Sequence, residues 1–251
     1  MNVVNLELYK LRHKHLFLMV ALFLLVEIGW AFMASSMSVS RNPDNGGWEP
    51  LIAMLSSMNG LFLPILSAIC VSRICDMEHK GNTWKLLLTA SVRRGKLYAA
   101  KYISASIIML WACMLQVLAI IAFGIINGIG QSVPLFLLIR FLIGTALTNM
   151  IIIALQQWVS MAVKNQAFAL SLGMVGGFLG LVADLLPSGV RRIFVWSYYT
   201  GLCPITQSYI SEKMQFIVRD ISSLLPVAAM LIVAGIVIYL AGSIHVSRQE
   251  V

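Results

Sequence analysis

The chain has 251 residues, of which 59% are hydrophobic and only 11% charged, and its mean hydropathy is +0.87. Soluble domains carry about a quarter charged residues, so this chain has too little charge to cover a water-facing surface. The composition excludes a soluble globular enzyme and a disordered or fibrous protein, and it predicts an integral membrane protein. The net charge of +8 does not by itself indicate nucleic-acid binding, because basic residues that border apolar segments typically mark the cytoplasmic side of a membrane.

Six apolar runs are long enough to cross the hydrocarbon core of a bilayer, which needs about 20 helical residues. They cover residues 16–37, 51–72, 102–126, 133–163, 167–186 and 221–244. The sequence therefore predicts an all-α membrane protein with six transmembrane helices, in a single domain over residues 1–251. The residues before the first run alternate apolar with charged side chains, which suits a short amphipathic helix at the membrane surface.

The lysines and arginines indicate how these spans are oriented. If the N-terminus is inside, most basic residues lie on the inner side, as the positive-inside rule requires. The residues on that side are Lys10, Arg12, Lys14, Arg73, Lys80, Lys85, Arg93, Arg94, Lys96, Lys101, Lys164 and Arg248. The opposite side has Arg41, Arg191, Arg192, Lys213 and Arg219, with Arg140 inside the fourth run. We therefore expect both termini to be cytoplasmic.

Two connections are long enough to contain structure of their own. The predicted cytoplasmic connection, residues 73–101, is polar and rich in charge. The predicted external connection, residues 187–220, mixes aromatic with polar residues and is more apolar than a plain loop. We expect part of it to lie in the interface or to re-enter the membrane. No internal repeat is visible, which disfavours an inverted-repeat carrier.

The cytoplasmic connection contains the most distinctive pattern in the sequence. Gly81-Asn82-Thr83 is typical of a turn followed by a helix start. An apolar stripe at helical spacing and a basic group come next, formed by Trp84, Leu87 and Leu88 and then by Arg93, Arg94 and Lys96. Two interpretations fit these residues: a short amphipathic helix on which a soluble partner docks, or a solvated loop whose basic residues only set the topology.

This part of the chain resembles a known transporter family. The residues that carry the resemblance are Glu78, Gly81-Asn82-Thr83, Lys85, Leu87-Leu88, Arg93-Arg94 and Lys101. They match the pattern between the second and third helices of ABC-2 type permeases, and the resemblance extends along the whole chain. The stretch from Glu78 to Lys85 and the aromatic Trp196-Ser197-Tyr198 are similar to the lantibiotic-immunity branch of that family.

The resemblance implies the permease subunit of an ATP-driven exporter in the bacterial cytoplasmic membrane. It implies separate ABC ATPase subunits that hold ATP and magnesium, a second permease copy or a sister permease, and a peptide antibiotic as substrate. It also implies a coupling helix over residues 78–91 that inserts into the ATPase. The implied contacts are Glu78, Gly81, Thr83, Trp84, Leu87, Leu88, Arg93 and Arg94.

The chain lacks the sequence motifs of a catalytic subunit. It contains no G-x-x-x-x-G-K-[ST] loop for phosphates, no H-E-x-x-H and no G-x-S-x-G elbow. Its four cysteines have no C-x-x-C spacing, and its histidines are not clustered within a span. We therefore expect no catalytic residue, metal ligand or cofactor in this chain.

Polar residues inside the spans form a second candidate site. Glu27 lies midway along the first run, where a charged residue costs about 2.5–3.5 kcal/mol, so it should face the bundle interior. Asn59 and Gln116 are its expected neighbours. Glu27 either contacts a cationic substrate, serves as a proton site, or forms a hydrogen bond that joins two helices. Glycines at G-x-x-x-G spacing in the fifth run (173, 176, 177 and 180) predict close helix contact, within the chain or with another subunit.

Other functions stay open on the sequence alone. The same fold suits export of a drug, a lipid or a cell-envelope precursor. An ATP-independent secondary carrier or a membrane scaffold is the alternative of a different class. A membrane-embedded enzyme ranks below these, because no catalytic cluster is visible.

Overall fold

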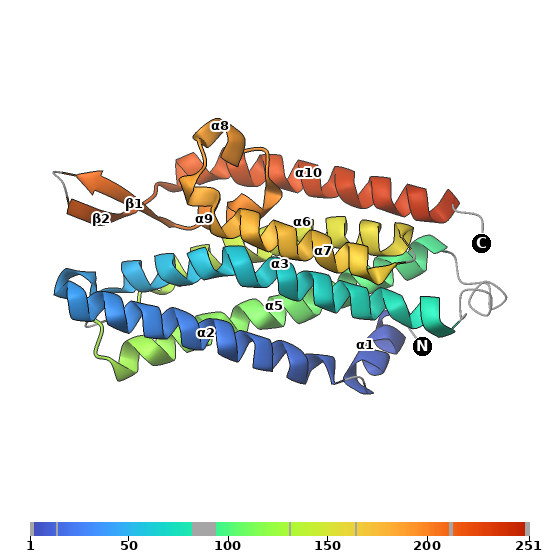
Figure 1. The fold of residues 1–251 in the computed structure, drawn as a ribbon, viewed down its shortest axis with the longest axis horizontal. Helices are drawn as coiled ribbons and strands as arrows, with labels where there is room; N and C mark the ends of the chain where they lie inside the picture. The colour runs from blue at the N-terminus through green and yellow to red at the C-terminus, as the bar shows by residue number, and fades with distance from the viewer. Residues whose placement is uncertain are drawn as a thin grey trace.

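The computed structural model describes residues 3–13, 15–81, 94–130, 132–163, 165–210 and 213–248. Long helices lie side by side along one axis and form a bundle (Figure 1). Five of them are long and apolar enough to cross a membrane. They are α2 (Leu16–Arg41), α3 (Trp48–Gly81), α5 (Arg94–Ile126), α6 (Leu135–Ala162) and α10 (Ile221–Arg248). The structure thus confirms a mostly helical protein with several membrane-spanning helices.

Each of these helices corresponds to one predicted apolar run; α6 is slightly shorter than its run 133–163, whereas α3 and α5 extend well beyond theirs. They continue into the region 73–101, which we expected to be a connection, so that α3 ends at Gly81 and α5 begins at Arg94. The first turns of α5 bury Leu97, Tyr98 and Ala100 against the rest of the bundle. Burial of this face explains why the helix begins before the apolar run.

The sixth predicted span is a shorter element. Helix α7 (Gln166–Leu181) has 16 residues, which gives a length of about 24 Å, less than the roughly 30 Å of a hydrocarbon core. A short 3-10 turn, η2 (Ala183–Leu185), follows it. A sixth full-length span therefore stays a prediction.

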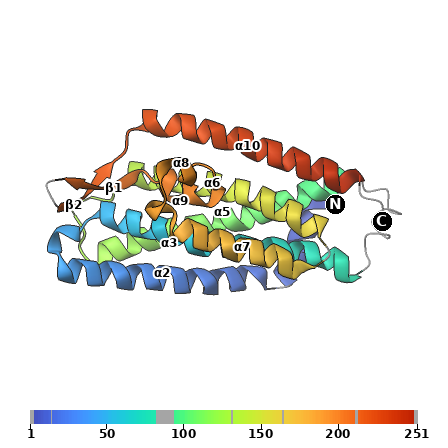
Figure 2. The same cartoon turned by 45° about the horizontal axis from the view of Figure 1, so that its top comes forward.

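Helix α7 lies closely against α3, and its glycines make this possible (Figure 2). A Cβ atom on Gly177 would lie 2.6 Å from the carbonyl oxygen of Leu61, and one on Gly60 would lie 2.7 Å from that of Gly180. Carbon atoms essentially never approach so closely, so these positions exclude any side chain. The glycines of the fifth run thus allow α7 to pack against α3 of the same chain.

The connection between α7 and α10 contains short helices and a hairpin. The helices are α8 (Ser188–Arg191), η3 (Val195–Ser197) and α9 (Tyr198–Gly201). Residues Tyr198, Tyr199 and Leu202 are buried, and α9 contacts α3 and α6, so this part enters the bundle. Strands β1 (Ile205–Ile210) and β2 (Lys213–Val218) are antiparallel, with Ile205 opposite Val218. We did not predict this hairpin, although two runs rich in β-branched and aromatic residues separated by two positions are its usual signal.

Four chain segments meet at one end of the bundle. Helix α1 (Val3–His13) confirms the short N-terminal helix and contacts α5. The turn into α2 uses a left-handed backbone conformation at His15, with φ of 51°. The C-terminal ends of α3 and α10 and the start of α5 lie at the same end as α1 (Figures 1 and 2). The structure thus brings the N-terminal helix, the last helix and both flanks of the predicted docking segment together.

Candidate functional site

The predicted coupling residues lie around the gap between α3 and α5. Glu78 and Gly81 belong to the last turn of α3, and Arg94 is the first residue of α5. The other predicted contacts, Thr83, Trp84, Leu87, Leu88 and Arg93, lie outside the described residues.

A buried ion pair joins the elements that flank this gap. Lys101 Nζ lies 3.2 Å from Glu7 Oε2 and donates a hydrogen bond of 2.8 Å to the carbonyl oxygen of Ile74. The side chains of Lys101 and Glu7 are 1% and 0% exposed. Because a buried charge costs several kcal/mol unless it is paired, this contact fixes α1, α3 and α5 to one another.

Apolar packing surrounds this ion pair. Leu11 of α1 is buried in one cluster with Ile74 and Cys75 of α3 and Tyr98 of α5. The other oxygen of Glu7 accepts a bond of 3.1 Å from Lys10, which is 34% exposed. We call this group of Glu7, Ile74 and Lys101 the α1 junction. Lys101 was expected from the charge pattern and from the family resemblance, but its partner Glu7, the only acid on α1, was not predicted.

The intramembrane site brings together all three predicted residues. Gln116 Nε2 of α5 donates to Asn59 Oδ1 of α3 at 2.7 Å, and Gln116 also lies beside Glu27 of α2. All three side chains are 0% exposed. Both carboxyl oxygens of Glu27, Asn59 Nδ2 and Gln116 Oε1 have no hydrogen-bond partner among the described residues. The interior of the bundle thus holds unsatisfied donors and acceptors that suit a polar or cationic group.

A second polar chain continues from this site. The Tyr199 hydroxyl donates to Asn149 Oδ1 at 2.5 Å, and Asn149 Nδ2 donates to Cys113 Sγ at 3.2 Å. Tyr199 and Cys113 both lie near Glu27. This chain links α9 with α5 and α6 inside the bundle. We did not predict this chain, although Asn149 within an apolar run was a usable signal.

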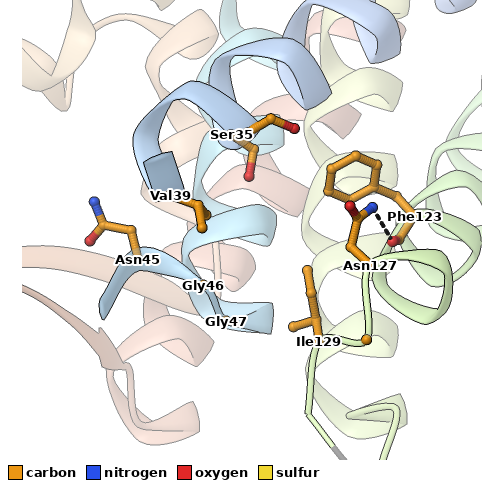
Figure 3. Close-up of a pocket in the computed structure, with 10 residues that line it drawn as sticks. Ser35, Val39, Asn45, Gly46, Gly47, Phe123, Asn127 and Ile129 are labelled. Carbon is orange, nitrogen blue, oxygen red and sulfur yellow. Dashed lines mark hydrogen bonds between the residues drawn. The ribbon is translucent and has the colours of Figure 1, made fainter. Parts of the chain in front are cut away.

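A neutral pocket lies at the end of the bundle away from α1. It has a volume of about 290 Å³ and lies between the ends of α2 and α5. Figure 3 shows Phe123 of α5 and Asn127, the residue after α5, across from Ser35 and Val39 of α2, with Asn127 Nδ2 donating to the Phe123 carbonyl oxygen at 2.8 Å. The residues that line the pocket carry no formal charge, so it offers little to attract an ion.

The long apolar helices, whose buried polar residues face the interior of the bundle, define a multi-pass membrane protein. Its sequence matches the model of the ABC-2 family transporter proteins over residues 3–180, and the chain belongs to that family. No curated protein matches the chain. Family membership makes the chain a membrane transport subunit and implies ABC ATPase subunits as its partners. The matched part contains the α1 junction, the predicted docking segment and the Glu27 site.

Proposed function

We propose that the chain is the permease subunit of an ATP-driven exporter that expels a lantibiotic-like peptide from the membrane for self-immunity. Family membership over residues 3–180 is the observation that supports the export role. The resemblance of residues 78–85 and of Trp196-Ser197-Tyr198 to the immunity branch supports the choice of substrate.

In this proposal, the segment 78–91 docks in a groove of the ATPase. Its first residues, up to Gly81, close α3, and the coupling helix follows them. Trp84, Leu87 and Leu88 supply apolar anchors, after a turn at Gly81 and Thr83. Glu78, Arg93 and Arg94 make polar contacts that respond to the nucleotide bound by the ATPase, which holds ATP and magnesium.

The α1 junction gives this coupling a structural path. Because Lys101 binds both Glu7 and the Ile74 carbonyl, a displacement of α3 or α5 displaces α1 as well. Force on the coupling helix is then passed on as a rigid-body movement of three connected elements. A second permease copy or a sister permease completes the transport pathway.

The Glu27 site supports a cationic substrate. The carboxyl group of Glu27 has no described hydrogen-bond partner, and Asn59 and Gln116 leave further polar atoms unsatisfied beside it. A basic group of an amphipathic peptide would supply the missing partner. The peptide would enter the transporter from the side, out of the lipid, because the helices in the described part of the bundle pack closely around a buried core.

The test is an affinity pull-down of the tagged chain from its host in mild detergent. We expect an ABC ATPase to be recovered with the wild-type chain and lost with Trp84→Ala. Trp30→Ala is the matched control. Trp30 lies on α2, and its side chain is 55% exposed on the surface of the bundle that faces lipid. Recovery of the ATPase with Trp84→Ala would contradict the coupling assignment.

The substrate is tested by ATP hydrolysis of the recovered complex in liposomes. We expect a lantibiotic to stimulate hydrolysis and Trp84→Ala to abolish the stimulation. Charge reversal at Glu78 should have the same effect while leaving the protein in the membrane. Stimulation by a drug, a lipid or an envelope precursor, with no response to peptide, would overturn the proposed substrate and leave the export role intact.

A further inference from the structure

Three arginines line a second pocket, which differs from the neutral one. It has a volume of about 240 Å³ and lies between the segment of α8, η3 and α9 and the first turns of α10. Arg191, Arg192 and Arg219 line it together with Ser197, Tyr198, Gly201 and Val227. We call it the arginine pocket.

The positive charge of this pocket exceeds the negative charge paired with it. Arg191 Nη2 lies 2.9 Å from Asp184 Oδ1, which neutralises one guanidinium group. Arg219 Nη1 donates to the carbonyl oxygen of Gly201 at 2.7 Å, an acceptor without a formal charge. Arg192 and Arg219 form no ion pair with a carboxylate in the described parts of the chain.

The charge of Arg219 is retained although the residue is half-buried. Burial lowers the pKa of its guanidinium group, and Arg191 acts in the same direction by repulsion. An arginine nevertheless stays protonated in proteins. Asp184 raises the pKa of Arg219 and so offsets part of the repulsion from Arg191. Arg192 and Arg219 still have no carboxylate partner among the described residues, so the pocket favours an anion.

The place of the pocket along the bundle indicates which anion reaches it. Val227, which lines it, lies in the first turns of the apolar helix α10, and α8 and α9 lie beside this part of the helix (Figures 1 and 2). Ile221 and Leu225 of α10 are exposed, as expected of side chains that face lipid. The hydrocarbon core meets the headgroups where such a helix begins, and tyrosines such as Tyr198 are typical of that level.

We propose that the arginine pocket binds the phosphate group of an anionic lipid headgroup. The planar guanidinium group matches phosphate oxygens with paired hydrogen bonds, and the N–H groups of Arg192 and Nη2 of Arg219 have no described acceptor. The ion pair with Asp184 holds Arg191 on one side of the pocket. The Tyr198 hydroxyl donates to the carbonyl oxygen of Arg192 at 2.7 Å, and this hydrogen bond fixes the backbone of Arg192. This site is independent of the transported substrate and of the ATPase.

The test is lipid binding to the purified full chain in a neutral detergent, measured by native mass spectrometry. We expect phosphatidylglycerol to bind in preference to phosphatidylcholine, and Arg192→Gln to weaken its binding about tenfold. Arg41→Gln is the matched control, because it removes the same charge from an exposed residue at the end of α2. Arg219→Gln should weaken binding too, but it also removes the hydrogen bond to Gly201.

Each outcome decides the proposal. Equal binding of the two lipids, or an equal loss with Arg41→Gln, would show non-specific charge attraction and overturn it. Displacement of the lipid by inorganic phosphate would assign the pocket to the free anion and overturn the lipid as the source. Retention of phosphatidylglycerol in excess inorganic phosphate, lost only with the pocket variants, would support it.

Discussion

Lys101 Nζ and Glu7 Oε2 lie 3.2 Å apart, although the two residues are separated by 94 positions in the sequence. Both side chains are almost completely buried. The N-terminal helix is therefore attached to the start of α5 by a charge interaction that has no access to water. Such a contact is costly to break from one side only, because Glu7 then stays buried with the partly exposed Lys10 as its remaining described ion-pair partner.

We expect Lys101→Met to destabilise the protein by about 3–5 kcal/mol, since it leaves Glu7 charged and buried. The measurement is thermal unfolding in detergent. Lys10→Met is the control, because it removes the partly exposed partner of the same carboxylate, and exposed pairs contribute only about 0–1 kcal/mol. Similar losses for both variants would show that burial does not set the strength of the Lys101 contact.

The main helices could be predicted from the sequence because the bilayer imposes a simple constraint. A spanning segment must satisfy its backbone hydrogen bonds internally and must be apolar over about 20 residues. The runs 16–37 and 221–244 accordingly begin at the first residues of α2 and α10. The hydropathy pattern could not show where α3 ends and α5 begins, because buried residues such as Tyr98 extend α5 on the N-terminal side of its apolar run.

The contacts between distant residues could be predicted only where polar residues lie inside apolar runs. The sequence indicated that Glu27, Asn59 and Gln116 should face the interior, and the structure places them together. The bond between Tyr199 and Asn149 depends on how α9 enters the bundle, which no local pattern specifies. Hydropathy does not mark where α7 stops, because the apolar run continues past Leu181, its last residue.

The glycines of α7 give a second prediction, which separates packing within the chain from contact between subunits. We expect Gly177→Val to destabilise the protein by about 1–3 kcal/mol or more, because its side chain would collide with the Leu61 carbonyl oxygen of α3. Gly29→Val is the control, since no atom lies within 4 Å of a Cβ at Gly29. Both are measured by thermal unfolding of the chain in detergent. A loss of self-association with unchanged unfolding would instead place this glycine at a subunit interface.

The hydrogen bond between Gln116 and Asn59 gives a third prediction. Gln116→Leu removes the donor to Asn59 Oδ1 and leaves that oxygen buried without a partner, which costs about 1–3 kcal/mol. Glu27→Gln should be neutral or stabilising in the same unfolding assay, because it replaces an ionisable buried group with a neutral one of the same shape. A clear loss of stability with Glu27→Gln would show that the carboxyl group has a structural partner.

The orientation of the bundle gives the last prediction. All four native cysteines are buried, so an introduced cysteine can be labelled against a low background. Ser40 lies near the end of α2 away from α1, and Gly95 lies in the first turn of α5; both are exposed. Because the basic residues concentrate on the side of Gly95, the positive-inside rule places that side in the cytoplasm.

A membrane-impermeant maleimide on intact cells should therefore label Ser40→Cys and leave Gly95→Cys unlabelled until the cells are opened. Neither substitution changes a charge, so the topology signal itself stays intact. The reverse pattern would place α1 and both flanks of the docking segment outside the cell, where no ATPase could reach them. It would also move the arginine pocket to the inner leaflet, so the same experiment decides which leaflet supplies its lipid.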